Sequence, residues 1–109
     1  MKYFCDFENR NAKELLPGVT IKTYWGKEML VSLVNIEPNT EIPLHSHFHE
    51  QAGTIVSGEL EMIIDGEKRR LNAGDSYIVP GNTEHYAKTG NSPATVLDVF
   101  SPVREEYKY

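Results

Sequence analysis

Turn-forming residues divide this chain into short segments, and none of these segments has a convincing helical period. The clearest alternation of apolar and polar residues is in 59–65. Leu60, Met62 and Ile64 lie two positions apart, and acidic residues lie on the other face. A tight hairpin signal, Asp65-Gly66, follows directly. Alternation of this kind places apolar side chains on one face of a strand. Because such short strands recur at regular spacing, the sequence predicts an all-β fold, an antiparallel sandwich or barrel.

The other predicted strands are runs of β-branched, aromatic or alternating residues between turns. They cover 19–25, 29–36, the histidine-rich stretch 43–51, 52–56, 68–71, 76–79, 85–88 and 95–100. Residues 1–18 are predicted to form an irregular or edge-strand entry segment that ends in a turn at Pro17-Gly18, and 101–109 a C-terminal tail. A chain of 109 residues suffices for one hydrophobic core, so we expect a single domain over 1–109.

Charge and cysteine content narrow the partners and the compartment. The net charge of −5 argues against nucleic acid or an anionic membrane surface as a partner. Cys5 is the single cysteine, so no intrachain disulfide can form and a reducing compartment is expected. No apolar run approaches the roughly 20 residues of a membrane span, and Asp6 stands where a signal peptide would be apolar. We therefore expect a soluble, cytoplasmic protein.

Three of the four histidines lie in the stretch His45-Ser46-His47-Phe48-His49-Glu50-Gln51. On a strand, His45 and His47 project to the same side. With Gln51 one turn later and His85 on a returning strand, these side chains can meet at one point. Imidazole nitrogens and a side-chain oxygen bind a divalent transition metal (Zn, Mn, Fe or Ni) and leave positions open for water or substrate. The sequence therefore predicts one mononuclear metal site.

Other interpretations of these residues remain open. The histidines could be ordinary barrel residues, although their spacing favours metal ligation. Gln51 could form a hydrogen bond to a ligand instead of binding the metal itself. Strict alternation would place His49 beside His47, but the chain must turn to deliver Gln51, so we expect an outward or supporting position for His49.

Two motifs resemble those of the cupin superfamily. The first runs from His45 to Gln51 and is followed by Gly58; the second runs from Gly74 through Pro80 to His85. The resemblance implies an antiparallel double-stranded β-helix, the jelly-roll barrel, as a small single-domain cupin. Asn39 and Asn82 stand where the family often has glycine, and Thr89 where it often has asparagine. Because asparagine tolerates left-handed geometry, these departures do not threaten the fold.

The informative departure is Gln51, which stands where glutamate is usual in cupins. A set of three histidines and one glutamine is neutral, so a bound ion keeps its full positive charge. Such an ion is a stronger Lewis acid toward a carboxylate, carbonyl or enolate oxygen. The donor set is thus suited to polarising an anionic substrate rather than to oxygen chemistry.

A second group of candidate residues lies near the C-terminus. Asp98 and Phe100 share a strand face with Val96, and an aspartate in so apolar a run is costly to bury without a partner. Pro102 ends the strand, so Arg104 can fold back across the barrel mouth. A guanidinium can grip the carboxylate of a sugar acid, an aromatic ring can pack on its pyranose, and an aspartate can move a proton.

The pattern Asp-Val-Phe-Ser-Pro-x-Arg over 98–104, together with the histidine motif, resembles the pectin-degradation cupins that linearise unsaturated uronates. That resemblance implies a metal held by three histidines and a glutamine, here His45, His47, Gln51 and His85. It also implies that Asp98 and Arg104 are catalytic and that Phe100 and Arg104 bind substrate. The implied reaction is metal-dependent ring opening of a 4,5-unsaturated uronate, such as unsaturated galacturonate, to the 5-keto-4-deoxy form.

Alternatives to this function also remain. Asp98 and Arg104 could be a structural ion pair, and Phe100 a core residue. The whole chain could be a cupin dioxygenase acting on a small organic acid, or a sugar-acid-binding cupin without activity. We expect a homodimer, for which the 19–25 strand is a plausible edge seam.

Overall fold

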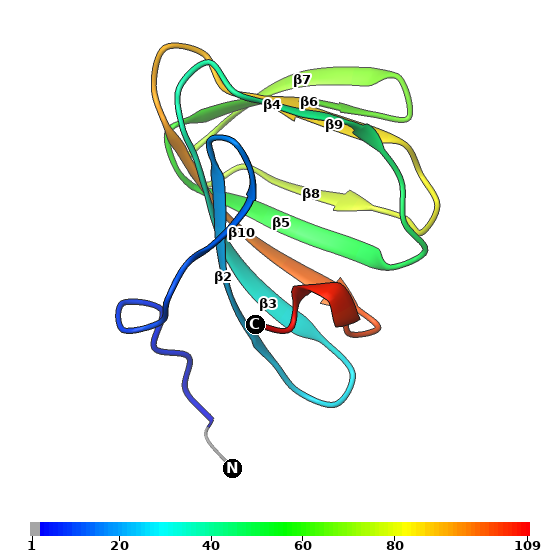
Figure 1. Cartoon of the computed structure of the whole chain (residues 1–109). Coiled ribbons are helices and arrows are strands. Elements are labelled where there is room, and N and C mark those ends of the chain that lie inside the picture. Colours follow the sequence, from blue (N-terminus) through cyan, green and yellow to red (C-terminus); the bar gives the residue numbers. More distant parts are fainter. Residues whose placement is uncertain (1–2) are drawn as a thin grey trace.

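The computed structural model describes residues 3–109, so the first two residues of the predicted entry segment lie outside it. Two antiparallel sheets pack face to face (Figure 1). The six-stranded sheet has the order β1-β2-β3-β10-β5-β8, and the four-stranded sheet the order β4-β9-β6-β7. The predicted all-β jelly-roll barrel is confirmed. The single-domain assignment stays a prediction.

The strand bounds agree with those predicted to within two residues, except at the end of the histidine-rich strand. The strands are β1 (Lys13–Leu16), β2 (Val19–Trp25), β3 (Leu30–Ile36), β4 (Glu41–His45), β5 (Glu50–Ser57), β6 (Glu59–Ile64), β7 (Glu67–Asn72), β8 (Ser76–Val79), β9 (His85–Lys88) and β10 (Ala94–Ser101). A single 3-10 turn, η1 (Glu105–Tyr107), is the helical element of the described chain. No helix among residues 3–109 has the length and apolar character that a membrane crossing requires.

Alternation along the strands builds the core between the two sheets. Every second residue of β2 from Val19 to Thr23 and of β10 from Ala94 to Phe100 is buried, and Leu60 and Met62 of β6 face the same core from the other sheet. This period of two is the one expected of strands that are covered on one face. A smaller apolar cluster around Phe100 lies apart from this main core.

The strand at 19–25 is not an edge strand over its whole length, because β1 covers its first part, and the dimer seam there stays a prediction. β1 pairs with the first part of β2, Lys13 opposite Ile21, and β3 pairs along its other side. The edge strands of this sheet are β1 and β8. That the protein is a homodimer stays a prediction.

The expectation that one strand carries both His45 and His47 is also wrong. β4 ends at His45, and the register with β9 shifts between Ile42 and His45. Pro43 lies within this shift, and proline cannot donate a ladder hydrogen bond. His47 is instead carried by the bend that leads into β5, and this bend is held where Asn82 N–H donates to His47 O at 2.7 Å.

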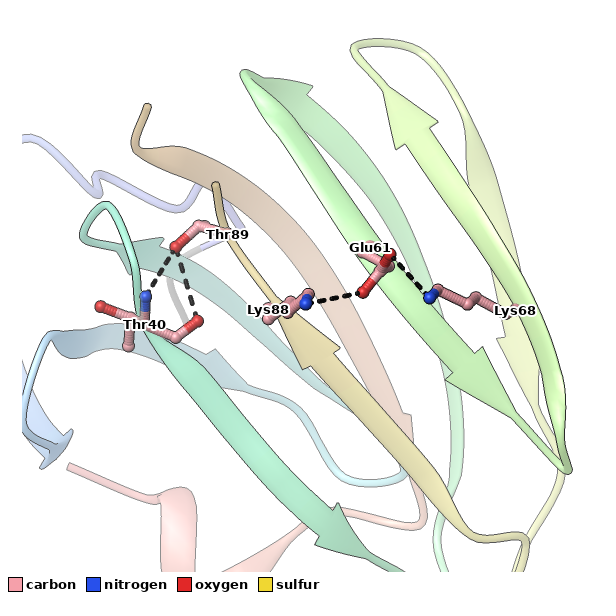
Figure 2. A network of polar contacts seen from close by, with 5 residues as sticks. All are labelled: Thr40, Glu61, Lys68, Lys88 and Thr89. Atoms are coloured by element: carbon pink, nitrogen blue, oxygen red, sulfur yellow. Dashed lines mark hydrogen bonds and ion pairs between the residues drawn. The ribbon is translucent and has the colours of Figure 1, made fainter. Parts of the chain in front are cut away.

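The departures from cupin glycines are accommodated as predicted. Asn39 has φ 54° and Asn82 φ 63°, both in the left-handed region that asparagine tolerates. Thr89 replaces asparagine by bridging two segments: its Oγ1 accepts from Thr40 N at 3.1 Å and donates to Glu37 O at 2.5 Å. Figure 2 shows the contact of Thr89 with Thr40 beside a separate ion-pair network on the four-stranded sheet.

Candidate metal centre and adjoining cavity

Three histidines converge at one end of the barrel. His45 ends β4, His85 begins β9 directly opposite it, and His47 lies on the following bend. Their ring centroids are 4.2 Å apart for His45 and His85 and 5.0 Å apart for His47 and His85. One ligand atom from each ring lies within 4.8 Å of the others. The cluster can therefore hold a metal ion.

Backbone carbonyls fix the tautomer of all three rings. Nδ1 of His45 donates to Pro43 O at 2.7 Å, that of His47 to His49 O at 3.0 Å, and that of His85 to Thr83 O at 2.9 Å. A carbonyl can only accept, so each proton lies on Nδ1 and each Nε2 presents a lone pair. His85 Nε2 is buried and has no hydrogen-bond partner among residues 3–109. A buried acceptor without a partner fits a metal ligand.

The electrostatics also favour neutral rings. Burial lowers the pKa of His85 to about 4, and the neighbouring His45, His47 and Arg104 add to this decrease. Burial and then the charge of Arg104 lower the pKa of His47 as well. Neutral imidazole is the form that binds metal, so these two rings are ready to do so at pH 7.

Gln51 on β5 is buried beside this cluster. Its Oε1 lies 3.1 Å from His47 Nε2, and its side chain lies close enough to Asp98 and Tyr77 to act on the pKa of each. Because the His47 proton is on Nδ1, two acceptor atoms face each other at 3.1 Å. A cation between them would remove this repulsion, so the side chain fits an oxygen ligand beside three nitrogens.

Of the two positions expected for His49, the outward one is wrong and the supporting one agrees with the structure. Its side chain is only 4% exposed, and its ring stacks on Phe48 with centroids 3.9 Å apart. The imidazole lies 5.6 Å from that of His47, and its own backbone carbonyl orients His47. His49 thus supports a candidate ligand through its main chain.

Asp98 is buried on β10, and its partner is a residue that sequence reasoning missed. The hydroxyl of Tyr77 on β8 donates a hydrogen bond to Asp98 Oδ1. Burial raises the pKa of Asp98 to about 6, even though Tyr77, Gln51 and Arg104 act in the opposite direction. A carboxyl in a run such as 95–100 signals that a buried partner must exist, but this signal does not identify the partner.

Arg104 lies against two aromatic rings at the end of the tail. Its guanidinium carbon is 4.0 Å from the ring centroid of Tyr107 and 5.2 Å from that of Phe100, and the side chain is 12% exposed. Its Nε lies 3.6 Å from Glu106 Oε2, which is too far for a hydrogen bond. This Nε has no hydrogen-bond partner in the described chain. Arg104 therefore pairs with Glu106 and keeps free hydrogen-bonding capacity.

Phe100 has two sets of neighbours. It is 3% exposed and packs with Leu30, Val103 and Tyr107, as a core residue would. Its ring also makes an edge contact with His47, at a centroid distance of 5.6 Å. The side chain is thus both packed and adjacent to the histidine cluster.

One cavity of about 310 Å³ brings the candidate residues together, apart from His47, which does not line it. Its polar lining consists mainly of His45, Gln51, Tyr77, His85, Asp98 and Arg104, and Phe100 borders the same space. The rest of the lining is mostly apolar and reaches Leu15 and Leu16 of β1. A volume of this order admits a small organic molecule.

The chain belongs to the cupin family, whose cupin-domain profile matches residues 32–100. It is also 30% identical over 108 residues to the pectin degradation protein KdgF of Dickeya dadantii, a match that covers 97% of each chain. The solved structure of KdgF from Halomonas sp. superposes with a TM-score of 0.91 at 29% identity, over 97% of this chain and 98% of that one. An RmlC-like cupin from Shewanella frigidimarina gives a TM-score of 0.90 at 27% identity, over 98% and 96%.

A further relative is an enzyme with a different name. The chain is 32% identical to the H2HPP isomerase of Bacillus subtilis over 84% of its own length, but it spans only 40% of that protein. Named enzymes among the relatives support an enzymatic cupin, and the full-length match is to a pectin-degradation protein.

Proposed function

We propose that this protein is a metal-dependent enzyme that opens the ring of 4,5-unsaturated uronates, such as unsaturated galacturonate, to the linear 5-keto-4-deoxyuronate. One observation carries the proposal: Asp98 and Arg104 line the same cavity as His45, His85 and Gln51. The full-length similarity to pectin degradation proteins supports the same substrate class.

The reaction is an isomerisation, so its protons must balance. The anomeric hydroxyl loses a proton as the bond between C1 and the ring oxygen breaks, and C4 gains a proton as C5 becomes a ketone. Asp98 relays this proton, accepting it at one position and donating at the other. Its pKa of about 6 suits both directions near neutral pH.

Arg104 binds the substrate carboxylate in this proposal, because its buried guanidinium has hydrogen-bonding capacity that Glu106 leaves free. Phe100 borders the ring of the bound sugar. A divalent cation held by His45, His47, Gln51 and His85 would act as a Lewis acid on a substrate oxygen. The protein side chains thus bind the acid group, orient the ring and move one proton.

Turnover of unsaturated galacturonate tests the proposal. The metal-loaded protein should accelerate the loss of the ultraviolet absorbance of the conjugated double bond above the rate without protein. Asp98→Ala and Arg104→Ala should each abolish most of this acceleration. Arg70→Ala is a matched control, because Arg70 is exposed on β7 and 3.8 Å from Glu59.

Each other outcome points to a different function. Oxygen consumption with a small organic acid would favour a dioxygenase. Uronate binding without turnover would favour a sugar-acid-binding cupin. If both site variants turned over like the parent, the assigned roles would be wrong even with the activity present.

A further inference from the structure

Asp98, Gly53 and Tyr77 form one row across three neighbouring strands. Gly53 of β5 is paired with Asp98 of β10 on one side and with Tyr77 of β8 on the other. Directly paired residues of a sheet point to the same face, and strands two apart are separated by about 10 Å. Asp98 and Tyr77 can therefore meet only if the residue between them leaves room.

Gly53 leaves that room. A Cβ added at this position would lie less than 3.0 Å from Asp98 Oδ1 and from the hydroxyl oxygen of Tyr77, closer than Cβ atoms approach other atoms. Gly53 is not among the glycines with positive φ, so its backbone conformation does not require glycine. The space above it does, and glycine inside a strand often marks such a close approach.

We propose that Tyr77 is a positioning residue for Asp98, and that Gly53 serves to let the tyrosine hydroxyl reach the carboxylate. This inference rests on the proposed function, in which Asp98 moves the proton. The tyrosine hydroxyl donates to Oδ1 and the Gln51 side chain lies beside the same carboxylate, so Asp98 is held toward the cavity in one orientation. Catalytic groups need this kind of fixed placement, because small displacements cost large factors in rate.

A purely structural role does not account for the hydroxyl of Tyr77. The tyrosine ring packs against the main core, and a phenylalanine would serve that purpose equally well. Burial of a hydroxyl is unfavourable unless it is hydrogen-bonded, and the Tyr77 hydroxyl donates its hydrogen bond to Asp98. Removal of the hydroxyl alone therefore separates the two roles.

Tyr77→Phe is the primary variant, and Tyr24→Phe is its matched control. Tyr24 also loses one hydrogen bond, from its hydroxyl to Asp6 O at 2.9 Å, but it lies away from the cavity. We expect Tyr77→Phe to lower kcat about 10-fold or more while KM changes less than about 3-fold, and Tyr24→Phe to change neither. A kcat of Tyr77→Phe equal to that of the parent would overturn the inference.

Thermal unfolding of the chelator-treated protein gives a second readout without turnover. We expect Tyr77→Phe to lower Tm in the parent but to lower it clearly less in an Asp98→Ala background, because the two residues share one interaction. Equal decreases in both backgrounds would contradict the inference. If the parent did not turn over uronate, the proposed function would be wrong. The coupling in Tm would still test the contact between Tyr77 and Asp98.

Gly53→Ala tests the remaining element of the row. We expect a larger loss of Tm and of kcat than for Gly26→Ala, since no atom lies within 4 Å of a Cβ built on Gly26. A Gly53→Ala variant with the Tm and kcat of Gly26→Ala would show that the space above Gly53 is not needed.

Discussion

Polar groups on the outer face of the four-stranded sheet have protein partners, whereas some of those in the cavity do not. On the outer face, Glu61 forms ion pairs with Lys68 at 3.3 Å and Lys88 at 3.4 Å (Figure 2). In the cavity, within residues 3–109, His85 Nε2 and Arg104 Nε are buried and have no hydrogen-bond partner. The charges on the outer face are thus satisfied by the protein itself, whereas these two nitrogen atoms in the cavity lack a hydrogen bond.

The two carboxylates, Glu61 and Asp98, show the same contrast in their pKa values. Desolvation alone would raise the pKa of Glu61, but its two lysine partners lower it overall. Burial dominates at Asp98 and raises its pKa to about 6. Buried polar groups without full compensation cost stability and occur where function requires them. Substitutions in the cavity should therefore change activity, and those on the outer face should barely change it.

The largest expected effect is on turnover by Asp98→Asn. Loss of a positioned acid–base group typically lowers kcat by about 10²- to 10⁴-fold. The measurement is uronate turnover with metal loading matched to the parent. A decrease of only a few fold would place Asp98 outside the proton-transfer step and remove the contrast with Glu61.

Asp98→Asn should lower turnover but raise the stability of the chelator-treated protein at neutral pH. The folded-state pKa of Asp98 is about 6 against an ordinary 3.8, so the folded protein binds this proton more tightly than the unfolded chain. Its contribution to stability therefore falls as pH rises from about 4 to 6, by up to about 3 kcal/mol. Asp98→Asn should remove this decrease, which denaturant unfolding at pH 4, 5, 6 and 7 measures. If Asp98→Asn kept the pH dependence of the parent, burial of the ionised Asp98 carboxylate would not be the cause of the decrease.

Arg104 distinguishes a binding charge from a structural one. Arg104→Ala should lower kcat/KM by about 10- to 100-fold, because a charge-assisted bond to the substrate carboxylate is lost. Arg104→Lys should restore only part of this, since lysine lacks the planar fork of arginine. Steady-state kinetics measures this, with Arg70→Ala as the control. Full recovery of kcat/KM in Arg104→Lys would argue against bidentate binding of the substrate carboxylate.

Thr89 should affect stability without affecting activity. Thr89→Val removes the bond to Glu37 O and leaves Thr40 N without its acceptor, for a loss of about 1–3 kcal/mol. Urea unfolding measures this, with Thr95→Val as control because the Thr95 hydroxyl bonds to Asn35 at an exposed position. A large decrease in kcat at full folding would show that this junction is coupled to the cavity.

The smallest effect is expected from Glu61→Gln. The pKa of Glu61 is lowered by its lysines, so its stabilising contribution is present above its ordinary pKa and lost as pH falls below it. We expect a slight decrease in Tm near pH 7 that shrinks at high salt, as for other ion pairs near the surface. Thermal scans at two salt concentrations test this, and a salt-independent decrease would point to a packing effect instead.

Much of the fold could be predicted because the strands are short, alternating and separated by strong turn signals. The candidate ligands could be identified because His45, His47 and His85 fall within recognisable motifs. The end of β4 could not be placed, since Pro43 shifts the register and the following bend delivers His47 by a route that alternation does not describe. For the same reason the sequence left both an outward and a supporting position open for His49.

Tyr77 and Gly53 were missed for a different physical reason. Their proximity to Asp98 depends on the register of β8, β5 and β10, which are separated in sequence and become neighbours only in the sheet. A glycine inside 50–57 and an aspartate inside an apolar strand were both visible as unusual residues. Only the sheet register shows that they explain each other.

The most direct test of the metal centre is calorimetric titration of the chelator-treated protein with Zn²⁺ or Ni²⁺, compared with His85→Ala. The parent should bind about one ion per chain, and His85→Ala should bind it at least about 100-fold more weakly while keeping the parent's circular dichroism spectrum. Equal affinity in the two proteins, or no binding by the parent, would contradict a metal centre formed by these histidines.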